Sequence, residues 1–493
     1  MAIFIAITTI GCNDDAWEAH YEQLDARLEN NLLSILSDKP EYSDFVDLLK
    51  KTGYDEVLKT PQAYTVWAPN NDALAKVSDD VLNDPDLLEE LIGNHISRFS
   101  YNTNGIETPA LVKMFNDKYI EFSNTDGTIK FGEVDVIQKD ILAANGILHI
   151  VSEVLNVSPN IWGYLNENEA RFPTLMNFYN QYNEIVFDQE NSIKVGTNSL
   201  GQTVYDSVFV QSNSYFKTIG DLSSEEERFT FIGLTDDVYN SEYDVFKEFY
   251  AHKIEDSTKA NTDKAIFSNI NFPVVNKDEL DGSPITTTTG NSVVLDPNTV
   301  LEDYSLSNGN LFVVNDLNYN PKDVIYKPIR YEIENSQRIE VGSLSDFTMQ
   351  SVYDKDASGE FISVVSLLAN PDRNEGNNYF EIAFANVLSA DYTLNLKFVP
   401  IGAQQQTKLK FEISYRGLSG RNTLIRVPAI VVDNQEDAEV KIGETYSFPV
   451  FVNNEMDNEF FVKLKVYVDV SEPELILYGR RIGIDYAELV PVD

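Results

Sequence analysis

Apolar positions in the first part of the chain follow the spacing of helix faces and then of a strand. Residues 31–58 hold apolar side chains at three- and four-residue intervals in two segments, which predicts two short helices. Residues 64–68 (YTVWA) predict a strand ended by Pro69, and residues 70–72 (NND) supply N-cap side chains for a third helix. The pattern therefore predicts helices and strands in close alternation.

The same order of elements occurs a second time. Residues 160–182 match the first pair of helices, and residues 229–239 (FTFIGLTDDVY) align with YTVWAPNNDAL of the first copy. Residues 308–314 (NGNLFVV) align with residues 145–151 (NGILHIV), and YAHKI with GNHIS. Two copies of one domain explain this internal repeat.

The second copy carries an insertion, residues 184–228. Within it, the sequence KVGTNSLGQTVYDSVFV predicts a β-hairpin that turns at residues 198–201.

Three motifs of the first copy, YTVWAPNNDAL, NHI and ANGILHIVSEVL, resemble the fasciclin domain in sequence and in order. The resemblance implies an α+β fold with two tandem fasciclin-like domains, residues 27–158 and a divergent copy at 159–319. It also implies adhesion or complex formation on a cell surface rather than catalysis. In the second copy Leu234 replaces the motif proline and Phe312 the motif histidine, so a function shared by both copies does not follow.

The motif histidines allow two interpretations. His95 falls in what reads as an apolar helix and His149 in an apolar strand, which favours core histidines with satisfied hydrogen bonds over metal ligands. Tyr64 and Trp67 are predicted to be core residues as well.

After residue 319 the helical periodicity ends, and strand-like runs separated by turn signals continue to the C-terminus. They predict an all-β sandwich, jelly-roll-like, over residues 320–493. The predicted strands are Phe347 to Tyr353, Phe361 to Leu367, Tyr379 to Phe384, Tyr392 to Val399, Leu409 to Tyr415, Leu424 to Val432, Tyr446 to Val452, Phe460 to Val470 and Ile482 to Val490. Residues 389–400 and 480–493 resemble carbohydrate-binding jelly rolls, and a plain sandwich for protein contacts is the alternative.

One turn of this domain has the composition of a cation site. Asp354, Asp356 and Ser358 place side-chain oxygens at alternate positions before a glycine, as calcium loops do. Val365 stands where an EF-hand has its bidentate acid, which excludes that motif. An ordinary hairpin turn is favoured, structural calcium is the alternative, and no other cofactor is expected.

Charge and motif content narrow the functional classes. The 79 acidic against 37 basic residues give a formal net charge of −42, which disfavours nucleic acid as a partner, and no cluster of Lys and Arg along the sequence suggests a local exception. Signatures of serine hydrolases, P-loop nucleotide binding and zinc metalloproteases are absent, so the chain is not expected to be an enzyme.

The N-terminal segment, residues 1–26, is interpreted as the remnant of a lipoprotein signal and a tether. Residues 1–11 are apolar but shorter than the roughly 20 residues of a membrane-spanning helix. They lead to Cys12, the single cysteine, which resembles the lipidated cysteine of a bacterial lipobox. Asn13, Asp14 and Asp15 resemble a surface-export signal. The expected location is the outer membrane, lipid-anchored and facing the exterior; the alternative is a buried strand with an incidental cysteine.

Two functions follow from this organisation. The first is a non-catalytic outer-membrane surface lipoprotein that acts as an interaction module, resembling accessory subunits of nutrient-uptake complexes in which a TonB-dependent transporter works with a lipoprotein. The alternative is a glycan-binding or adhesive surface protein that uses the C-terminal sandwich. The first requires a large exposed apolar patch for an outer-membrane partner. The second requires an exposed aromatic platform for a surface glycan, and strand alternation alone does not tell whether the following residues face inward: Tyr353, Tyr392, Tyr415, Tyr446, Phe461 and Tyr467.

Overall fold

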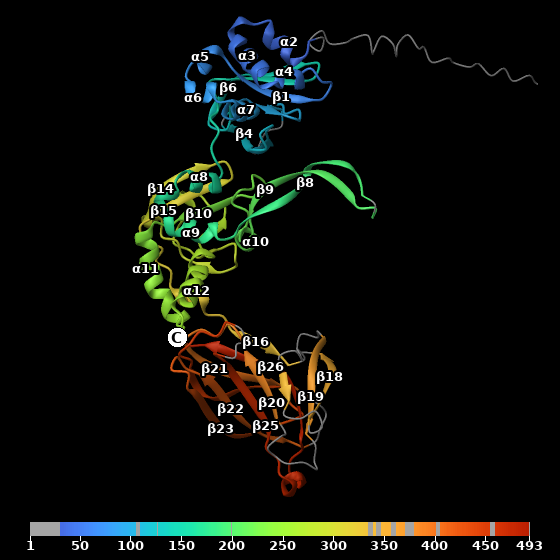
Figure 1. Cartoon of the computed structure of the whole chain (residues 1–493), viewed down its shortest axis with the longest axis vertical. Coiled ribbons are helices and arrows are strands. Elements are labelled where there is room, and N and C mark those ends of the chain that lie inside the picture. The colour runs from blue at the N-terminus through green and yellow to red at the C-terminus, as the bar shows by residue number, and fades with distance from the viewer. Residues whose placement is uncertain are drawn as a thin grey trace, which may run out of the picture. The chain divides into compact units, whose positions relative to one another are not determined.

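The computed structural model describes residues 30–493 except 105–108, 126, 199, 334–338, 342–346, 356–360, 370–378, 401–404, 454–458 and 493, and gives only the backbone for the described part of 334–378 and for residues 125, 190 and 191. Three parts of the chain carry their own sheets: the first body (residues 32–151), the second body (161–314) and the third body (329–491) (Figure 1).

The first body packs short helices against a seven-stranded sheet of order β2-β1-β7-β6-β5-β4-β3. Its helices are α2 (Leu32–Ser37), η2 (Pro40–Tyr42), α3 (Ser43–Thr52), α4 (Tyr54–Val57), α5 (Asn71–Leu74), α6 (Asp79–Asn83) and α7 (Pro85–Gly93). Its strands are β1 (Tyr64–Pro69), β2 (Ile96–Ser97), β3 (Ala110–Lys113), β4 (Tyr119–Thr125), β5 (Thr128–Phe131), β6 (Val134–Ala143) and β7 (Gly146–Val151).

Local sequence explains where these elements begin and end. Asn70 caps α5, since its side-chain oxygen accepts from the Ala73 amide at 2.9 Å, and Gly53 ends α3 in the left-handed conformation. Strand β1 is buried along its whole length and pairs in parallel with β7. The two predicted helices, the strand and the capped helix are confirmed, with the strand continuing through Pro69.

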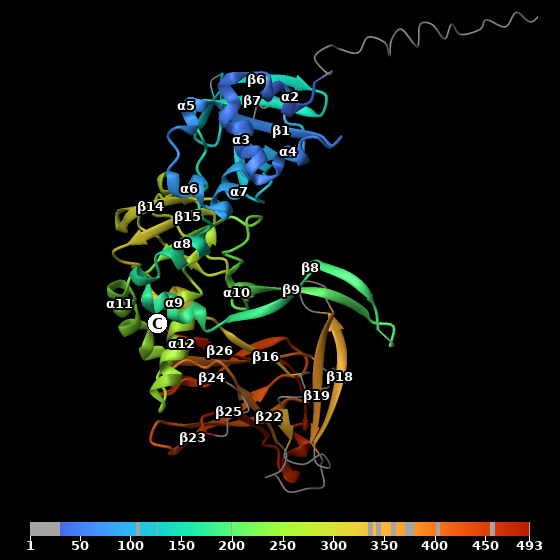
Figure 2. The ribbon, with the colours of Figure 1, turned by 45° about the horizontal axis from the view of Figure 1, so that its top comes forward.

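The second body repeats the arrangement around a four-stranded sheet of order β11-β10-β15-β14 (Figure 2). Its helices are α8 (Ile161–Glu167), η3 (Glu169–Arg171), α9 (Pro173–Asn180), α10 (Phe216–Ile219), α11 (Asp236–Phe246), η4 (Lys247–Tyr250) and α12 (Glu255–Phe267). Its strands are β8 (Asn183–Thr197), β9 (Thr203–Asn213), β10 (Phe229–Gly233), β11 (Asn271–Pro273), β12 (Ile285–Thr286), β13 (Ser292–Val293), β14 (Val300–Leu306) and β15 (Gly309–Val314). Short helices η5 (Lys277–Glu279) and η6 (Pro297–Thr299) join them.

Both bodies contain the same structural motif, an asparagine followed by a glycine, which we call the asparagine–glycine device. Asn145 accepts from the Leu32 amide at 2.9 Å at the start of α2, and Asn308 accepts from the Ile161 amide at 2.8 Å at the start of α8. The next residue is glycine in each copy because a Cβ there would lie 1.9 Å from the Tyr64 carbonyl oxygen in the first body. At Gly309 it would lie 1.8 Å from the Phe229 oxygen. These shared contacts support the internal repeat read from the sequence.

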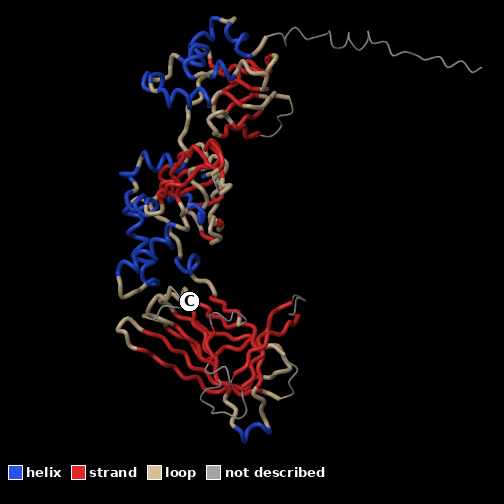
Figure 3. The backbone as a smooth tube through the Cα atoms, turned by 45° about the vertical axis from the view of Figure 1, so that its right-hand side comes forward, coloured by secondary structure: helices blue, strands red, loops and turns tan. Residues whose placement is uncertain are grey.

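The third body is a β-sandwich, which Figure 3 shows as almost entirely strand. One sheet has the order β18-β19-β26-β21-β24, with β16 paired to β26, and the other has the order β17-β20-β25-β22-β23. Its strands are β16 (Ile329–Glu332), β17 (Ile339–Val341), β18 (Phe347–Lys355), β19 (Phe361–Ala369), β20 (Tyr379–Phe384), β21 (Asp391–Phe398), β22 (Thr407–Arg416), β23 (Asn422–Val432), β24 (Ala438–Ser447), β25 (Val462–Val468) and β26 (Arg481–Pro491). The helices α13 (Pro321–Ile325) and η9 (Glu472–Ile476) lie outside these sheets.

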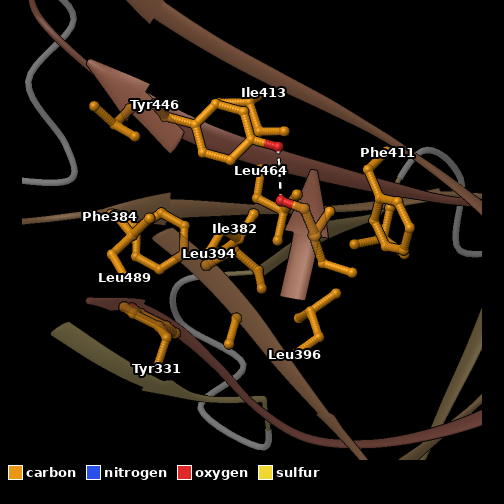
Figure 4. Packing of buried hydrophobic residues seen from close by; sticks show 14 of the residues in the cluster. Tyr331, Ile382, Phe384, Leu394, Leu396, Phe411, Ile413, Tyr446, Leu464 and Leu489 are labelled. Carbon is orange, nitrogen blue, oxygen red and sulfur yellow. Dashed lines mark hydrogen bonds between the residues drawn. The ribbon is translucent and has the colours of Figure 1, made fainter. Parts of the chain in front are cut away.

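Side chains from both sheets fill the interior of the sandwich (Figure 4). Leu394 and Leu396 point inward from one sheet, and Phe411 and Leu464 from the other. The buried Tyr446 hydroxyl donates to the Ile442 carbonyl at 2.8 Å, so its polar end is satisfied within the core.

Eight of the nine predicted sandwich strands coincide with observed strands, and one prediction is wrong. The strand expected over residues 446–452 is β24, which lies at Ala438–Ser447 instead. Pro449 lacks a backbone N–H for a ladder, and the apolar residues after it are buried as irregular chain.

Candidate interaction surfaces

The structure describes few of the sequence-predicted site residues. Cys12, Asn13, Asp14 and Asp15 lie outside the described residues, and so do Asp356 and Ser358. Asp354 is in β18, where it pairs with Ile362 of β19. Among the described side chains, no group of three or more His, Cys, Asp or Glu is placed to hold a metal ion.

Both motif histidines lie in the core of the first body. His95 is fully buried, follows the end of α7 rather than lying within it, and bonds through Nδ1 to the Trp67 carbonyl at 2.8 Å. Burial lowers the pKa of His95 to about 4, although the Trp67 carbonyl acts to raise it. His149 in β7 accepts from the Asp140 amide through Nδ1 and bonds to the Tyr101 carbonyl through Nε2 at 2.9 Å.

These contacts confirm the core placement but not the full satisfaction of His95, whose Nε2 has no hydrogen-bond partner. Tyr64 and Trp67 are also buried, as predicted, and the Trp67 ring stacks on Phe131 with 4.4 Å between centroids. The two motif histidines are therefore residues of the packed core of the first body.

The predicted hairpin of the insertion is the most exposed apolar feature of the second body. Strands β8 and β9 pair with each other, with register shifts between Asp188 and Ile193 and between Lys194 and Gly196, and form the hairpin arm, residues 183–213 (Figure 2). Its turn is fixed by Asn198, whose side-chain oxygen accepts from the Leu200 and Gln202 amides at 2.9 Å. In the described part of the chain neither strand pairs with a third strand.

Both faces of the hairpin arm carry exposed apolar side chains. Phe187 lies opposite Phe209, and Ile185 is on the same face of the ladder, 77% exposed. The other face carries Val208 and Val210, 40% and 39% exposed. Further exposed apolar residues follow toward the tip: Ile193, Val195, Leu200 and Val204. A soluble monomer rarely exposes so many apolar side chains side by side.

The second surface is the outer face of the β17-β20-β25-β22-β23 sheet. Strand alternation points Val462, Leu464, Val466 and Val468 of β25 inward and leaves Lys463, Lys465 and Tyr467 on the outside. Tyr467 lies between Tyr379 of β20 and Lys410 of β22 in the ladder, and the two tyrosine rings are 5.4 Å apart. We call this set, with Lys408, Glu381, Glu412 and Arg426, the tyrosine–lysine face.

Ion pairs link the members of this face. Glu381 contacts both Lys463 at 2.8 Å and Lys465 at 3.2 Å. Glu412 accepts from the Tyr467 hydroxyl at 2.7 Å and from Arg426 at 2.9 Å. Burial acts to raise the pKa of Glu412, but these two donors outweigh it and lower that pKa, so this carboxylate is charged at neutral pH.

The structure shows which aromatic side chains of the sandwich are buried and which face outward, a distinction that strand alternation alone did not give. Tyr392 and Tyr446 are buried, Tyr467 faces outward, and Tyr415 packs partly exposed against Phe448. Phe461 stands beneath the Arg416 guanidinium, and the side chain of Tyr353 is not described. The sequence analysis did not propose Tyr379, Lys463 or Lys465 as surface site residues. Each of them alternates with core residues at strand spacing, which is the signal that could have identified them.

No helix in the described residues combines the length and the apolar character needed to cross a membrane.

Comparisons with known proteins agree with the fold of the first body. Residues 40–157 match the model of the fasciclin domain family. This segment is a fasciclin domain, and the whole chain is an α+β protein with additional β-sheet bodies. Fasciclin domains are adhesion and interaction modules.

Curated relatives match about a quarter of the chain. Transforming growth factor-beta-induced protein ig-h3 of Sus scrofa is 25% identical over 131 residues, which is 26% of this chain and 19% of that protein. Human periostin is 24% identical over 133 residues, covering 26% of this chain and 16% of its own length. Protein sll1483 of Synechocystis is 22% identical over 130 residues, 25% of this chain and 72% of that protein. The chain thus spans under a fifth of the first two relatives.

Solved structures are similar to two regions. A fasciclin domain pair from the insect cell adhesion molecule fasciclin I has 17% identity and a TM-score of 0.24, covering 58% of this chain and 99% of that one. A xylan-binding domain from Paenibacillus barcinonensis has 12% identity and a TM-score of 0.24, covering 34% of this chain and 94% of that one.

Proposed function

We propose that this protein is a non-catalytic surface lipoprotein of an outer membrane that acts as an interaction module. Its partner is another outer-membrane protein, namely the TonB-dependent transporter of a nutrient-uptake complex, to which it is an accessory subunit. The single observation that carries the proposal is the hairpin arm, which exposes apolar residues on both faces and whose two strands pair with no third strand among the described residues. The fasciclin domain, an adhesion and interaction module, supports the same class of function.

A partner is favoured because, within the part of the chain that the structure describes, the arm is a sheet of two strands only. An isolated two-stranded hairpin is marginally stable in water, and its edges can pair with a further strand. Fully burying a side chain of the size of Ile185 or Phe209 stabilises by about 1.5–3 kcal/mol each. These residues are 77% and 61% exposed, so most of that stabilisation is still to be gained on binding.

Charge favours a different protein over a second copy of this chain. The arm contains Glu184, Asp188, Glu190 and Asp206 against Lys194, and the whole chain has a net charge of −42. Two copies would repel each other, whereas a partner with Lys and Arg around an apolar site is attracted. The expected occupant is therefore an apolar surface or strand edge with a basic rim.

The test is recovery of the protein from its native outer membrane in mild detergent. The natural chain should be recovered in a stoichiometric complex with a transporter. The double variant Ile185→Asp with Phe209→Asp should be recovered alone, because two charges would be carried into the apolar contact. Leu301→Asp is the matched control, since Leu301 in β14 is 61% exposed but lies outside the arm.

Two results would contradict the proposal. One is recovery of the natural chain without any partner. The other is equal loss of the complex in the arm variant and in Leu301→Asp.

Attachment to the membrane is a separate part of the proposal. Cys12 would carry the lipid, and Asn13, Asp14 and Asp15 would direct the protein to the outer surface. A single acyl chain binds membranes marginally, whereas several chains give stable anchoring. Mass spectrometry of the protein from its own host should find lipid on Cys12. A bare thiol together with recovery in the soluble fraction refutes the anchor.

Glycan binding by the third body is the second candidate function. The outward-facing pair Tyr379 and Tyr467 favours it, because adjacent tyrosines on a sheet face are the aromatic platform that such binding requires. A shift in affinity gels containing polysaccharide tests it.

A further inference from the structure

We infer that the tyrosine–lysine face binds an anionic polysaccharide, one whose sugar residues carry carboxylate or sulfate groups. This inference rests on the second candidate function and specifies its ligand class. It depends on the charge, the exposure and the ring contacts of the face.

The face gathers cations in a chain that is strongly acidic as a whole. The protein has a net charge of −42, and its sequence shows no local run of Lys and Arg. The sheet nevertheless gathers cations from three strands, β22, β23 and β25: Lys408, Lys410, Arg426, Lys463 and Lys465. The carboxylates paired with them are Glu381, Glu412, Asp469 and Glu474. Within this set of ion pairs there are five cations and four carboxylates.

Two of the carboxylates, Glu381 and Glu412, are less exposed than the cations that pair with them, whereas Asp469 and Glu474 are more exposed than Lys408. The side chains of Glu381 and Glu412 are 14% and 20% exposed. Those of Lys410 and Arg426 are 44% and 76% exposed. Around Glu381 and Glu412, solvent therefore meets mainly N–H donors, and these two acids hold the cations in position. An approaching anion is attracted to a cation layer that is already ordered.

The tyrosine rings distinguish anionic from neutral sugars. The Lys465 ammonium lies 4.2 Å from the centroid of the Tyr379 ring, and the Lys410 ammonium lies 5.3 Å from that of Tyr467. A neutral sugar must displace these ammonium groups to stack on the rings. An acidic sugar pairs with them and contacts the same rings beside them.

The spacing suits a linear polymer. Lys463 and Lys465 are two positions apart on β25, which separates them by about 7 Å along the strand. Lys410 and Arg426 extend the cations across neighbouring strands. A chain with repeated charges can contact several of them at once, and each contact adds to the affinity.

The experiment measures binding of the whole protein to polygalacturonate and alginate, with neutral dextran and xylan as comparison polymers and polyglutamate as a polyanion without sugar rings. Titration calorimetry at two salt concentrations gives the affinities. We expect binding to the two acidic polysaccharides that weakens with salt, and little binding to the other three polymers.

Two matched double variants locate the site. Lys463→Gln with Lys465→Gln should weaken binding about tenfold, equivalent to about 1.4 kcal/mol. Lys397→Gln with Lys441→Gln removes the same charge from the outside of the opposing sheet, where Asn395 pairs with Lys441 and Lys397 pairs with Glu439, and should leave binding unchanged. Equal urea midpoints for the two variants show that both are folded.

The remaining outcomes separate this inference from the function on which it rests. Binding of neutral polysaccharides alone overturns the anionic ligand class but keeps glycan binding. No binding to any polysaccharide overturns both. Equal binding of polyglutamate, or equal losses in the two double variants, shows attraction by charge without a site and overturns the inference.

Discussion

Replacing Asn308 by alanine tests the device that the two repeats share. Asn308 is fully buried, and its side chain satisfies three backbone groups. Its oxygen accepts from the Ile161 amide at 2.8 Å, and its nitrogen donates to the carbonyls of Leu222 and Ser224, both at 2.9 Å. Asn145 in the first body makes two such contacts, to the Leu32 amide at 2.9 Å and the Leu58 carbonyl at 2.6 Å, and is partly exposed.

The magnitude follows from these contacts. A buried polar group left without a partner costs about 1–3 kcal/mol. In Asn308→Ala the Leu222 carbonyl keeps the Trp162 amide as a donor at 3.1 Å, so two groups, the Ile161 amide and the Ser224 carbonyl, lose their partner. The second body should therefore lose at least about 2 kcal/mol, whereas water can replace part of the loss in Asn145→Ala. An exposed control is Asn166→Ala, which removes one bond to the Trp162 carbonyl on the surface of α8.

Hydrogen exchange measured by mass spectrometry is the suitable assay, because a chain with several bodies does not unfold in one step. Peptides from β10 and β15 should exchange at least about 25-fold faster in Asn308→Ala, since each 1.4 kcal/mol is a factor of ten. Peptides of the first body should be unchanged. If Asn308→Ala lowers the exchange protection of the second body no more than Asn166→Ala does, or no more than Asn145→Ala lowers that of the first body, the asparagine–glycine device does not stabilise the second body.

Three further predictions concern other positions. Since the pKa of His95 is about 4 when folded and about 6.5 when unfolded, the unfolded chain binds the proton first. The first body should then lose about 3 kcal/mol as pH falls from 6.5 to 4, and exchange protection factors of its peptides that stay constant over this range contradict the buried neutral ring. Gly146→Ala should abolish the β1–β7 pairing, because its Cβ would lie 1.9 Å from the Tyr64 carbonyl oxygen; normal exchange protection of β7 would refute this. Asn213→Ala should loosen the hairpin arm by removing its bond to the Tyr179 carbonyl, seen as faster exchange in β8 and β9 with an unchanged β15; equal rates in β8 and β9 argue against that role.

The sequence predicted those parts of the fold that depend on local pattern. The N-cap at Asn70, the hairpin turn at Asn198 and most sandwich strands follow from spacing and turn chemistry, and all are observed. The strand at Ala438–Ser447 was missed because it buries only Ile442 and Tyr446 among its ten residues, whereas the next segment is richer in apolar residues but contains Pro449. Burial of a segment does not require that it be a strand.

The candidate surfaces were less predictable for a different reason. The tyrosine–lysine face joins Tyr379, Lys410 and Tyr467 from strands far apart in sequence, and their register depends on the whole sandwich. A scan for runs of Lys and Arg misses such a face, because each strand contributes only one or two cations. The exposure of the hairpin arm could not be predicted either. Turn residues between two strand-like runs predict a hairpin, but they do not tell whether other parts of the chain cover its faces.

The root of the hairpin arm connects the repeat to the proposed docking. Asn213 is 5% exposed and donates to the Tyr179 carbonyl and to the Asn183 side chain, both at 2.8 Å, while the Ser214 amide donates to the Tyr182 carbonyl at 2.9 Å. The arm therefore begins at a fixed point on the buried end of α9, not on a flexible loop. Fixing the root removes conformations that binding would otherwise have to exclude, so less of the apolar contact energy is lost to ordering. The second copy thus keeps the scaffold contacts of the first and adds an apolar arm with a fixed root, which is the surface that the proposed docking would use.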